Sequence, residues 1–300
     1  MDDFQLHFTD QLKVPAFIVS NPDQITVPFV FNSPHSGRHY TPYFLNQSRL
    51  SPLLLRKSED ALVDYIYEFA TALGAPLLAA TFPRAYVDVN REPYELDPHL
   101  ISSPLPSHAN SESIRVAAGL GTIARVVGTG LEIYRQQLTL EEALWRIENL
   151  YHPYHQALKS LLDEQVCRFN QAILIDCHSM PSSSPSYSNS IRPDIVVGDR
   201  FGHSANSEMV AFLIELLSDK GFNVAYNTPY AGGYITENYG KPNASIHAIQ
   251  VEIDRSLYMD EVLLEPHSGF SELSEKLQSV FQRFVSDVTH SLIHNKHAAE

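Results

Sequence analysis

The run of residues 172–177 constrains the fold of this chain most strongly. It is short, apolar and rich in branched side chains, and polar residues bound it, which is typical of a buried strand. Similar strand-like runs alternate along the chain with longer segments of helical periodicity. A strand followed by a helix, repeated several times, predicts an α/β fold. We expect a mainly parallel or mixed central sheet with helices on both faces.

The expected strands are 27–31, 76–80, 86–89, 172–177, 194–198, 223–226 and 246–253, and the expected helices are 61–73, 138–170, 207–219 and 271–293. Thr139 and Glu142 have the spacing of a capping box at the start of the second helix, and Pro153 predicts a kink within it. The proline-rich segment 93–110 and the serine-rich segment 181–190 are expected to form loops beside a site.

Charge excludes two classes of partner. The chain has 21 Lys and Arg against 35 Asp and Glu, a formal net charge of −14. Nucleic-acid binding needs a basic surface, and anionic membranes attract one, so neither is expected as a partner. A small acidic molecule remains possible as a substrate if local cations bind it.

The remaining composition indicates a globular protein of the cytoplasm. No stretch approaches the length of a membrane span, and the acidic start Met1-Asp2-Asp3 lacks the pattern of a secretory signal. Cys167 and Cys177 are too few for a disulfide framework and fit free thiols in a reducing compartment. We see no linker, so residues 1–300 are expected to form a single domain. The sequence carries no signal for an oligomeric state.

Two histidines follow predicted strands directly. His35 comes after 27–31, and His178 comes after 172–177. Strand ends are where α/β folds place their chemistry, and neutral imidazole is a common ligand of divalent metals. A catalytic zinc takes three protein ligands and keeps one position for water. His35 and His178 therefore predict most of a zinc site, although the chain has 14 histidines and most have ordinary roles.

The third ligand is expected to be a carboxylate. Glu59 and Asp60 are the nearest candidates, and both precede the expected helix 61–73, whose backbone N–H groups favour an anion. The same position also fits a simple charge at a helix N-terminus. The local residues leave both interpretations, and both carboxylates, open.

Glu252 is a charged side chain within the otherwise apolar strand 246–253. A buried carboxylate without a partner is costly, so this position indicates either a function or a strong ion pair. Beside a metal, Glu252 could act as the general base that takes a proton from water and returns it to a leaving amine. The alternative is a buried pair with an arginine such as Arg255.

Arg84, Asn90 and Arg91 cluster near the expected strand 86–89. Arginine binds a carboxylate through two parallel hydrogen bonds, which suits a small acidic substrate. Surface salt bridges are the competing explanation. Arg84 and Arg192 are weaker candidates for a second carboxylate of the same substrate.

Cys177 lies next to His178, an arrangement that a cysteine hydrolase would also show. Neighbouring side chains of a strand point to opposite faces, so Cys177 should turn away from His178. Asp176 and His178 share a face instead, and Asp176 is expected to orient the histidine.

Several of these motifs, in this order, resemble the N-formylglutamate amidohydrolase family along most of the chain. The matching segments are Asn32-Ser33-Pro34-His35-Ser36-Gly37, Asp60 with Asp64, Val87-Asp88-Val89-Asn90-Arg91, Asp176-Cys177-His178-Ser179-Met180, Asp194-Ile195-Val196-Val197-Gly198-Asp199, Gly232-Gly233-Tyr234-Ile235-Thr236 and Gln250-Val251-Glu252.

The resemblance implies a zinc-carboxypeptidase-like α/β fold with a metal-activated water. It implies His35, His178 and a carboxylate as metal ligands, Glu252 as the base, and Asn90 with Arg91 as the clamp for a substrate carboxylate. Asp60 is preferred over Glu59, because Asp60 aligns with the family's recurrent aspartate. The His-x-x-Glu ligand pair of the carboxypeptidases is absent, since Arg38 stands three residues after His35.

The activity implied is zinc-dependent hydrolysis of N-formyl-L-glutamate to formate and L-glutamate, as a step of histidine degradation. Hydrolysis of other N-acyl amino acids is the nearest alternative. A non-catalytic protein that binds an acidic metabolite, and a cysteine amidase, are alternatives from other classes. Metal content and the effect of chelators separate them.

Overall fold

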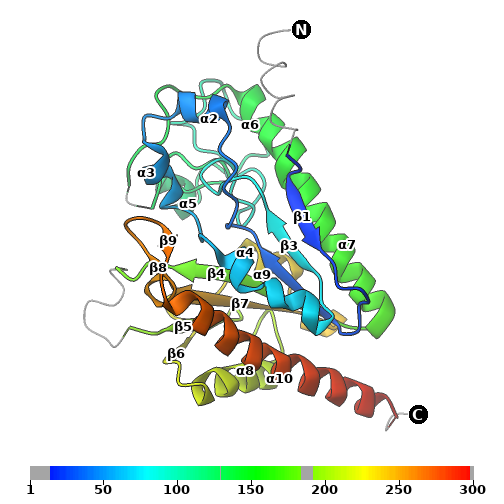
Figure 1. Ribbon diagram of the computed structural model, residues 1–300. Helices are drawn as coiled ribbons and strands as arrows, with labels where there is room; N and C mark the ends of the chain where they lie inside the picture. Colours follow the sequence, from blue (N-terminus) through cyan, green and yellow to red (C-terminus); the bar gives the residue numbers. More distant parts are fainter. Residues whose placement is uncertain (1–13, 129, 184–191, 298–300) are drawn as a thin grey trace. The chain divides into compact units, whose positions relative to one another are not determined.

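The computed structural model describes residues 14–128, 130–183 and 192–297. Its main feature is a seven-stranded mixed sheet (Figure 1). The strands lie in the order β1 (Phe17–Ser20), β3 (Leu77–Ala80), β2 (Phe29–Ser33), β4 (Ala172–Met180), β7 (Ile246–Asp254), β5 (Ile195–Gly198) and β6 (Val224–Tyr226). β2, β4 and β7 run parallel, whereas β5 runs antiparallel to β7 and parallel to β6. The predicted α/β fold with a mixed central sheet is confirmed.

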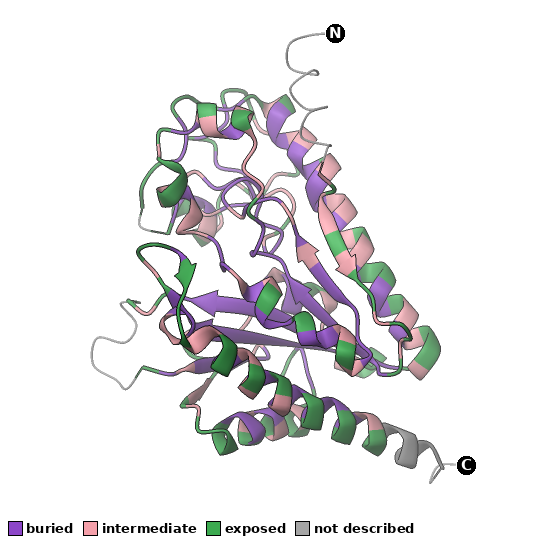
Figure 2. Ribbon diagram, in the orientation of Figure 1, coloured by how far each residue is buried: buried purple, intermediate pink, exposed green. Residues whose placement is uncertain are grey.

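The middle of the sheet is formed by β4 and β7, which pair over nine residues from Ala172 opposite Ile246 to Met180 opposite Asp254. All nine residues of β4 are buried. Strands covered on both faces have no exposed side to make polar, which explains the continuous apolar run 172–175 at the start of β4. Figure 2 shows this burial along the central strands.

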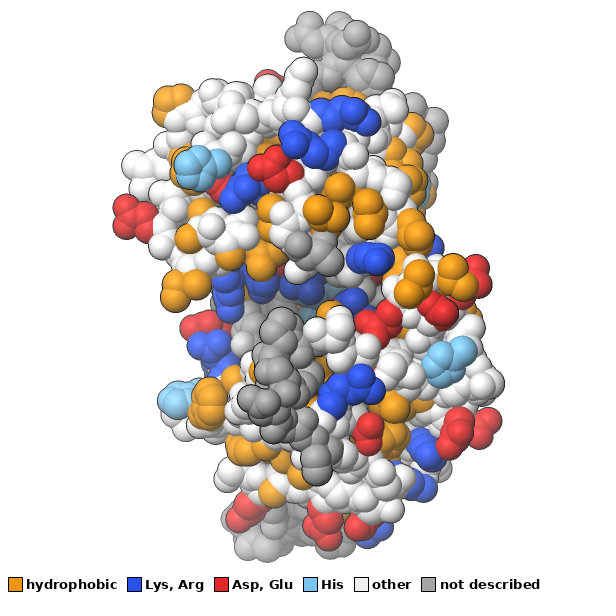
Figure 3. All heavy atoms as spheres, turned by 90° about the vertical axis from the view of Figure 1, so that its left-hand side faces the viewer, with side chains coloured by type: hydrophobic (Ala, Val, Ile, Leu, Met, Phe, Trp, Pro, Cys, Tyr) orange, Lys and Arg blue, Asp and Glu red, His pale blue; other side chains and the backbone are white. Residues whose placement is uncertain are grey.

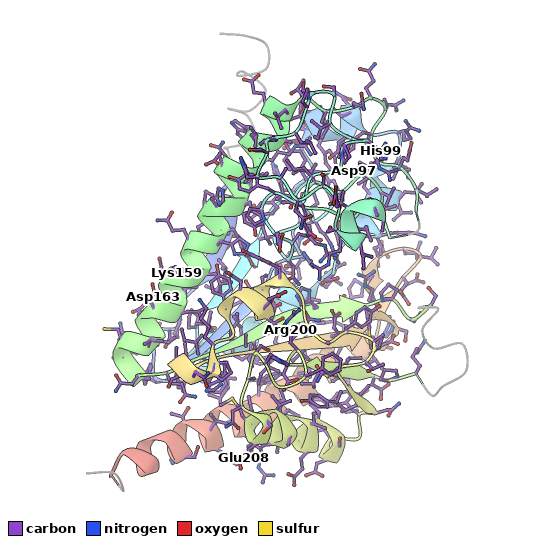
Figure 4. The ribbon with its side chains drawn as sticks, turned by 180° about the vertical axis from the view of Figure 1, so that it is seen from behind. Asp97, His99, Lys159, Asp163, Arg200 and Glu208 are labelled. Atoms are coloured by element: carbon purple, nitrogen blue, oxygen red, sulfur yellow. The ribbon has the colours of Figure 1, made fainter. Side chains whose placement is uncertain are left out.

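One face of β2 is aromatic. Phe29 and Phe31 on β2 pack against Phe281 and Phe284 of α10 (Gly269–His297). α10 also packs against α8 (Ser207–Asp219), and α9 (Tyr234–Tyr239) lies against β7 on the opposite face (Figures 1 and 4). The helices therefore cover both faces of the central strands.

The other α-helices are α2 (Pro42–Gln47), α3 (Pro52–Arg56), α4 (Val63–Ile66), α5 (Ile114–Ala117), α6 (Leu140–Arg146) and α7 (His152–Phe169). A π-helical turn, Ile147–Tyr151, links α6 to α7, and 3-10 turns occur at η1 (Glu68–Leu73), η4 (Pro242–Ala244) and η5 (Arg255–Leu257). A short hairpin consists of β8 (Met259–Asp260) and β9 (Glu265–Pro266). No helix in the described ranges is long and apolar enough to cross a membrane.

The chain divides into two compact units. The first contains the segments up to Ile18, Pro34–Ala61 and Ala79–Leu158. The second contains Val19–Ser33, Leu62–Leu78 and the chain from Lys159 onward, and so holds the central strands.

A buried arginine organises the first unit. Arg146 is fully buried, and its guanidinium lies 3.8 Å from the centre of the Tyr86 ring. It donates to the Tyr134 hydroxyl over 2.6 Å and pairs with Glu142 one helical turn earlier. The charge is therefore matched by a carboxylate, hydroxyl and aromatic faces, as a buried charge requires.

Several predicted elements are confirmed. β3, β4, β5, β6 and β7 occupy the expected strands, and α8 and α10 occupy the expected helices. Thr139 caps α6 by accepting a hydrogen bond from the Glu142 N–H over 3.1 Å. The Glu142 carboxylate binds Arg146 instead of completing the capping box. Most of the predicted loop 181–190 lies outside the described residues.

Two predictions of local structure are wrong. Residues 86–89 form no strand, because the Tyr86 N–H bonds to Pro83 in a turn and the Tyr86 carbonyl accepts from Arg146. The expected helix 61–73 is broken into α4 and η1. Leu62 adopts a left-handed backbone with φ of 67°, which prevents the helix from starting before Val63.

Candidate functional site

His35 lies two residues beyond β2, with its side chain almost completely buried. Its Nε2 lies 2.8 Å from Oδ1 of Asp88, and its Nδ1 lies 3.4 Å from Oδ2 of Asp60. The His35 carbonyl accepts a hydrogen bond from the Asp60 N–H over 3.0 Å, which fixes the two segments side by side. An ionised carboxylate only accepts, so Nε2 is the donor in the contact with Asp88.

Asp88 is the centre of a charged group in the first unit. Its Oδ1 accepts from His35 and from the Asn90 N–H over 2.9 Å, and its Oδ2 accepts from Arg84 Nε over 3.0 Å. Arg91 Nε lies 3.8 Å from the same Oδ2. Burial alone would raise the pKa of Asp88, but Arg84, Arg91 and His35 hold it well below its usual range. Asp88 is thus a permanent anion that orients His35.

Of the two carboxylates considered as the third ligand, Glu59 is engaged elsewhere. It pairs with Arg56 Nε over 3.2 Å and hydrogen-bonds to Tyr40. Burial raises the pKa of Glu59, while Tyr40 and Arg56 oppose that shift. Asp60 faces His35 instead.

His178 lies in the last third of β4, and its Nε2 lies 3.0 Å from Oδ2 of Asp176 on the same face of the strand. Oδ1 of Asp176 accepts from the Asn32 side chain on β2 over 2.7 Å. Asn32 and Asp176 are paired in the register of β2 and β4, so this contact follows from the sheet itself. As with His35, a buried carboxylate holds Nε2, a contact that fixes the orientation of the imidazole ring.

Glu252 is the register partner of His178 on β7. Paired residues of parallel strands point to the same face, so His178 and Glu252 are neighbours there. Glu252 is 8% exposed, and its Oε1 accepts from Gln250 Nε2 over 3.0 Å. Arg255, the alternative partner, donates to the hydroxyl of Ser179 over 3.1 Å.

His35, Asp60 and His178 each offer a ligand atom, and within the described residues these atoms lie within 4.8 Å of one another. All three side chains are buried. Two imidazole nitrogens and one carboxylate match the protein ligands of a catalytic zinc. Both histidines have Nε2 held by a carboxylate, the usual support of a metal-bound imidazole. The group could therefore bind a metal ion.

The arginines predicted to bind substrate differ in their surroundings. Arg91 is largely buried, and it donates from Nε to the Leu120 carbonyl over 3.0 Å and from Nη1 to the Asn90 carbonyl over 2.9 Å. A guanidinium has five N–H groups, so these two bonds anchor Arg91 and leave it further donors. Arg84 is bound to Asp88 through Nε.

Arg192 belongs to the second unit. It contacts Asp254 through Nε over 2.7 Å, the Ser256 hydroxyl over 2.9 Å and the Ser182 carbonyl over 3.3 Å. These contacts tie together the segments on either side of the undescribed residues 184–191. Arg192 is therefore engaged in a structural role that the sequence alone did not indicate.

Cys177 points away from the face that carries His178. Its thiol is fully buried and contacts the Ile175 carbonyl, and burial raises the pKa of Cys177 well above its usual range. A nucleophilic cysteine needs a thiolate, so this environment argues against a cysteine hydrolase.

Sequence reasoning assigned no role to Asp88, Asn32 or Gln250. The available signal was the recurrence of polar residues at i and i+2 in apolar strands, at Asp176 with His178 and at Gln250 with Glu252. Period two places both members on one face. Asp88 and Asn90 have the same spacing, but the segment around them forms no strand, so period two does not describe their side chains.

The acidic chain does not present a uniformly acidic surface. On the face drawn in Figure 3, Lys and Arg side chains form several groups among acidic and apolar ones. Local potentials, rather than net charge, decide whether an anion can approach.

Comparison with known proteins adds independent evidence. The family model of N-formylglutamate amidohydrolase matches residues 27–259. The N-formylglutamate deformylase of Pseudomonas aeruginosa is 27% identical over 265 residues, covering 87% of this chain and 92% of that protein. The enzyme of the same name from Pseudomonas putida is 26% identical over 266 residues, covering 86% and 91%.

Solved structures agree. The N-formylglutamate amidohydrolase of Ralstonia eutropha JMP134 superposes with a TM-score of 0.88 at 33% identity, covering 93% of this chain and all of that one. A gene product of Agrobacterium tumefaciens shares the fold with a TM-score of 0.68 at 16% identity, covering 93% and 98%. Motifs, architecture and family match converge, and the chain belongs to the N-formylglutamate amidohydrolase family.

Proposed function

We propose that this chain is a zinc-dependent amidohydrolase that converts N-formyl-L-glutamate and water to formate and L-glutamate. The family match over residues 27–259 supports the reaction, and it includes segments of both compact units, in keeping with one amidohydrolase domain. The observation that carries the metal is the buried group of His35, Asp60 and His178.

His35, Asp60 and His178 would hold the zinc ion. When bound, zinc supplies a Lewis acid that polarises the formyl oxygen and lowers the pKa of water. The donor set favours zinc over magnesium or calcium, because those ions prefer oxygen ligands.

Glu252 takes the role of general base. It accepts a proton from the attacking water and returns it to the leaving amine of glutamate. Its position supports this, since it is a buried carboxylate on the same sheet face as His178. Cleavage of the formyl C–N bond then releases formate and glutamate.

Asn90 and Arg91 bind a carboxylate of the substrate. The backbone of Asn90 and the guanidinium of Arg91 are both held in the Asp88 group, so their positions are set before substrate arrives. Preorganisation of this kind reduces the entropy lost on binding. Arg84 and Arg192 remain the weaker candidates for the second carboxylate.

We further place the enzyme in the cytoplasm and in histidine degradation. Two free cysteines, Cys167 and Cys177, support a reducing compartment. The pathway follows from the substrate that the family resemblance implies.

The experiment is formate release from N-formyl-L-glutamate, N-formyl-L-glutamine and an N-formylated apolar amino acid. We expect the highest kcat/KM with N-formyl-L-glutamate and loss of activity with a chelator. Equal kcat/KM on all three would indicate a broader N-acyl amino-acid hydrolase. Binding of N-formyl-L-glutamate without formate release would indicate a binding protein instead.

A further inference from the structure

Gln250 sits between a glycine-containing turn and the proposed base. Its Oε1 accepts from the Gly233 N–H over 3.0 Å, and its Nε2 donates to Oε1 of Glu252 over 3.0 Å. The side chain is only 4% exposed, and all three residues belong to the second unit. We propose that Gln250 is a positioning residue that sets the orientation of the Glu252 carboxylate. This inference rests on the proposed function of Glu252.

The direction of both hydrogen bonds is determined by chemistry. A backbone N–H can only donate, so the amide oxygen of Gln250 must face Gly233. The amide NH₂ must then face Glu252, whose ionised carboxylate can only accept. Gly233 thus fixes which way the Gln250 amide points, and Gln250 fixes one oxygen of Glu252.

The turn that supplies the Gly233 N–H is itself well defined. Gly232 has φ of 127°, a region that other residues rarely adopt. A Cβ on Gly232 would lie 2.5 Å from Oγ1 of Thr236, whose hydroxyl donates to the Gly233 carbonyl over 2.9 Å. Both peptide groups of Gly233 are therefore held, its N–H by Gln250 and its carbonyl by Thr236.

The sheet register places Gln250 and Glu252 beside Asp176 and His178. Gln250 is level with Asp176 on β4, and Glu252 is level with His178. Asp176 holds Nε2 of His178, and Gln250 holds Oε1 of Glu252. Neighbouring strands thus use the same i and i+2 arrangement, one to orient a proposed metal ligand and the other to orient a proposed base.

The first test is the Gln250→Leu variant, which removes both hydrogen bonds at similar volume. We expect kcat for N-formyl-L-glutamate to fall about 10- to 100-fold, the usual effect of removing a group that orients a site residue. KM and zinc content should change little, because Gln250 is proposed to contact neither substrate nor metal. A kcat within about twofold of wild type would overturn the proposal.

The decisive measurement is a double-mutant cycle with Glu252→Gln. If Gln250 acts through Glu252, adding Gln250→Leu to Glu252→Gln should cost almost nothing further in kcat. If Gln250 merely supports the fold, Gln250→Leu should lower kcat by the same factor in both backgrounds, and the proposal fails. Glu252→Gln alone with near-normal kcat would refute the proposed base, whatever Gln250 does.

Gln250→Glu provides a second variant should the leucine form not fold. It keeps an acceptor for Gly233 but places a carboxylate oxygen against Glu252. The matched control is Asn227→Asp. Asn227 is another buried amide that accepts from a backbone N–H and donates to a carboxylate, here both of Asp199. We expect both variants to lose stability and only Gln250→Glu to lose kcat. Equal losses of kcat would contradict the proposal.

Discussion

Replacing Asp88 by Asn should separate the role of its charge from that of its shape. With the amide oxygen at the Oδ1 position, the bonds from His35 and from the Asn90 N–H can persist. The amide NH₂ must then occupy the Oδ2 position. There it faces Nε of Arg84 at 3.0 Å and Nε of Arg91 at 3.8 Å, so donors meet donors.

The expected loss of unfolding free energy follows from those contacts. Removing one member of a buried ion pair typically costs about 3–5 kcal/mol. The Arg84 side chain is 28% exposed and can regain water, whereas Arg91 is only 13% exposed. Because water screens the partly exposed Arg84, we expect Asp88→Asn to lose about 3 kcal/mol of unfolding free energy, the lower end of that range. Zinc affinity should fall about 10- to 100-fold as His35 loses an anionic partner.

Asp97→Asn is the matched control. Asp97 is buried, pairs with Arg125 Nε over 2.7 Å and accepts from the His99 N–H over 2.8 Å. Arg125 is 25% exposed, close to the value for Arg84. Figure 4 labels Asp97 and His99. Urea unfolding should show similar losses for both variants, with zinc affinity reduced only in Asp88→Asn. Unchanged stability of Asp88→Asn, or equal zinc affinity of the two variants, would refute this reasoning.

Three further outcomes are expected. Arg91→Lys should lower kcat/KM for N-formyl-L-glutamate at least about tenfold, because an ammonium cannot form two parallel hydrogen bonds. Steady-state kinetics equal to those of wild type would show that Arg91 does not bind the substrate. Cys177→Ala should lose about 1–2 kcal/mol of unfolding free energy through packing yet retain zinc-dependent formate release, and a folded, zinc-loaded but inactive variant would contradict the assigned strand face. Burial lowers the pKa of His247, whose Nδ1 accepts from the Asn206 N–H over 3.2 Å. Its folded pKa lies below its unfolded value of about 6.5, so it contributes stability above that pH that is lost as the pH falls through the folded value. Urea unfolding of His247→Gln should therefore vary less with pH below about 6.5 than unfolding of wild type, and an identical pH dependence would exclude this role.

The regular, buried parts of the fold were the most predictable from sequence. β4 begins with an apolar run, β7 alternates apolar and polar residues, and α8 has a clear amphipathic period, so local pattern and tertiary structure agree there. The segment 86–89 is also mostly apolar. However, the Asp88 N–H donates to the Thr122 carbonyl, and the Tyr86 carbonyl accepts from Arg146. Those partners are distant in sequence, and local periodicity carries no information about them.

Some residues of the candidate site could likewise be predicted from sequence, and others could not. Strand-end position was enough to single out His35 and His178, because the carboxyl edge of a sheet is set by topology. The choice between Glu59 and Asp60 depends on which side chain faces His35, and Glu59 turns to Arg56 and Tyr40 instead. The contact between Gln250 and Gly233 joins a strand to a turn with an unusual glycine backbone, which no spacing in the sequence reveals.

The most direct test of the central claim is a zinc titration of chelator-treated protein, with formate release from N-formyl-L-glutamate as the readout. The account predicts no turnover without metal, a linear rise in activity up to one zinc per chain, and no recovery in His35→Ala or His178→Ala, both of which should remain folded. Full turnover by the metal-free protein, or normal zinc-dependent turnover by either alanine variant, would contradict the assignment of His35, Asp60 and His178 as the metal site.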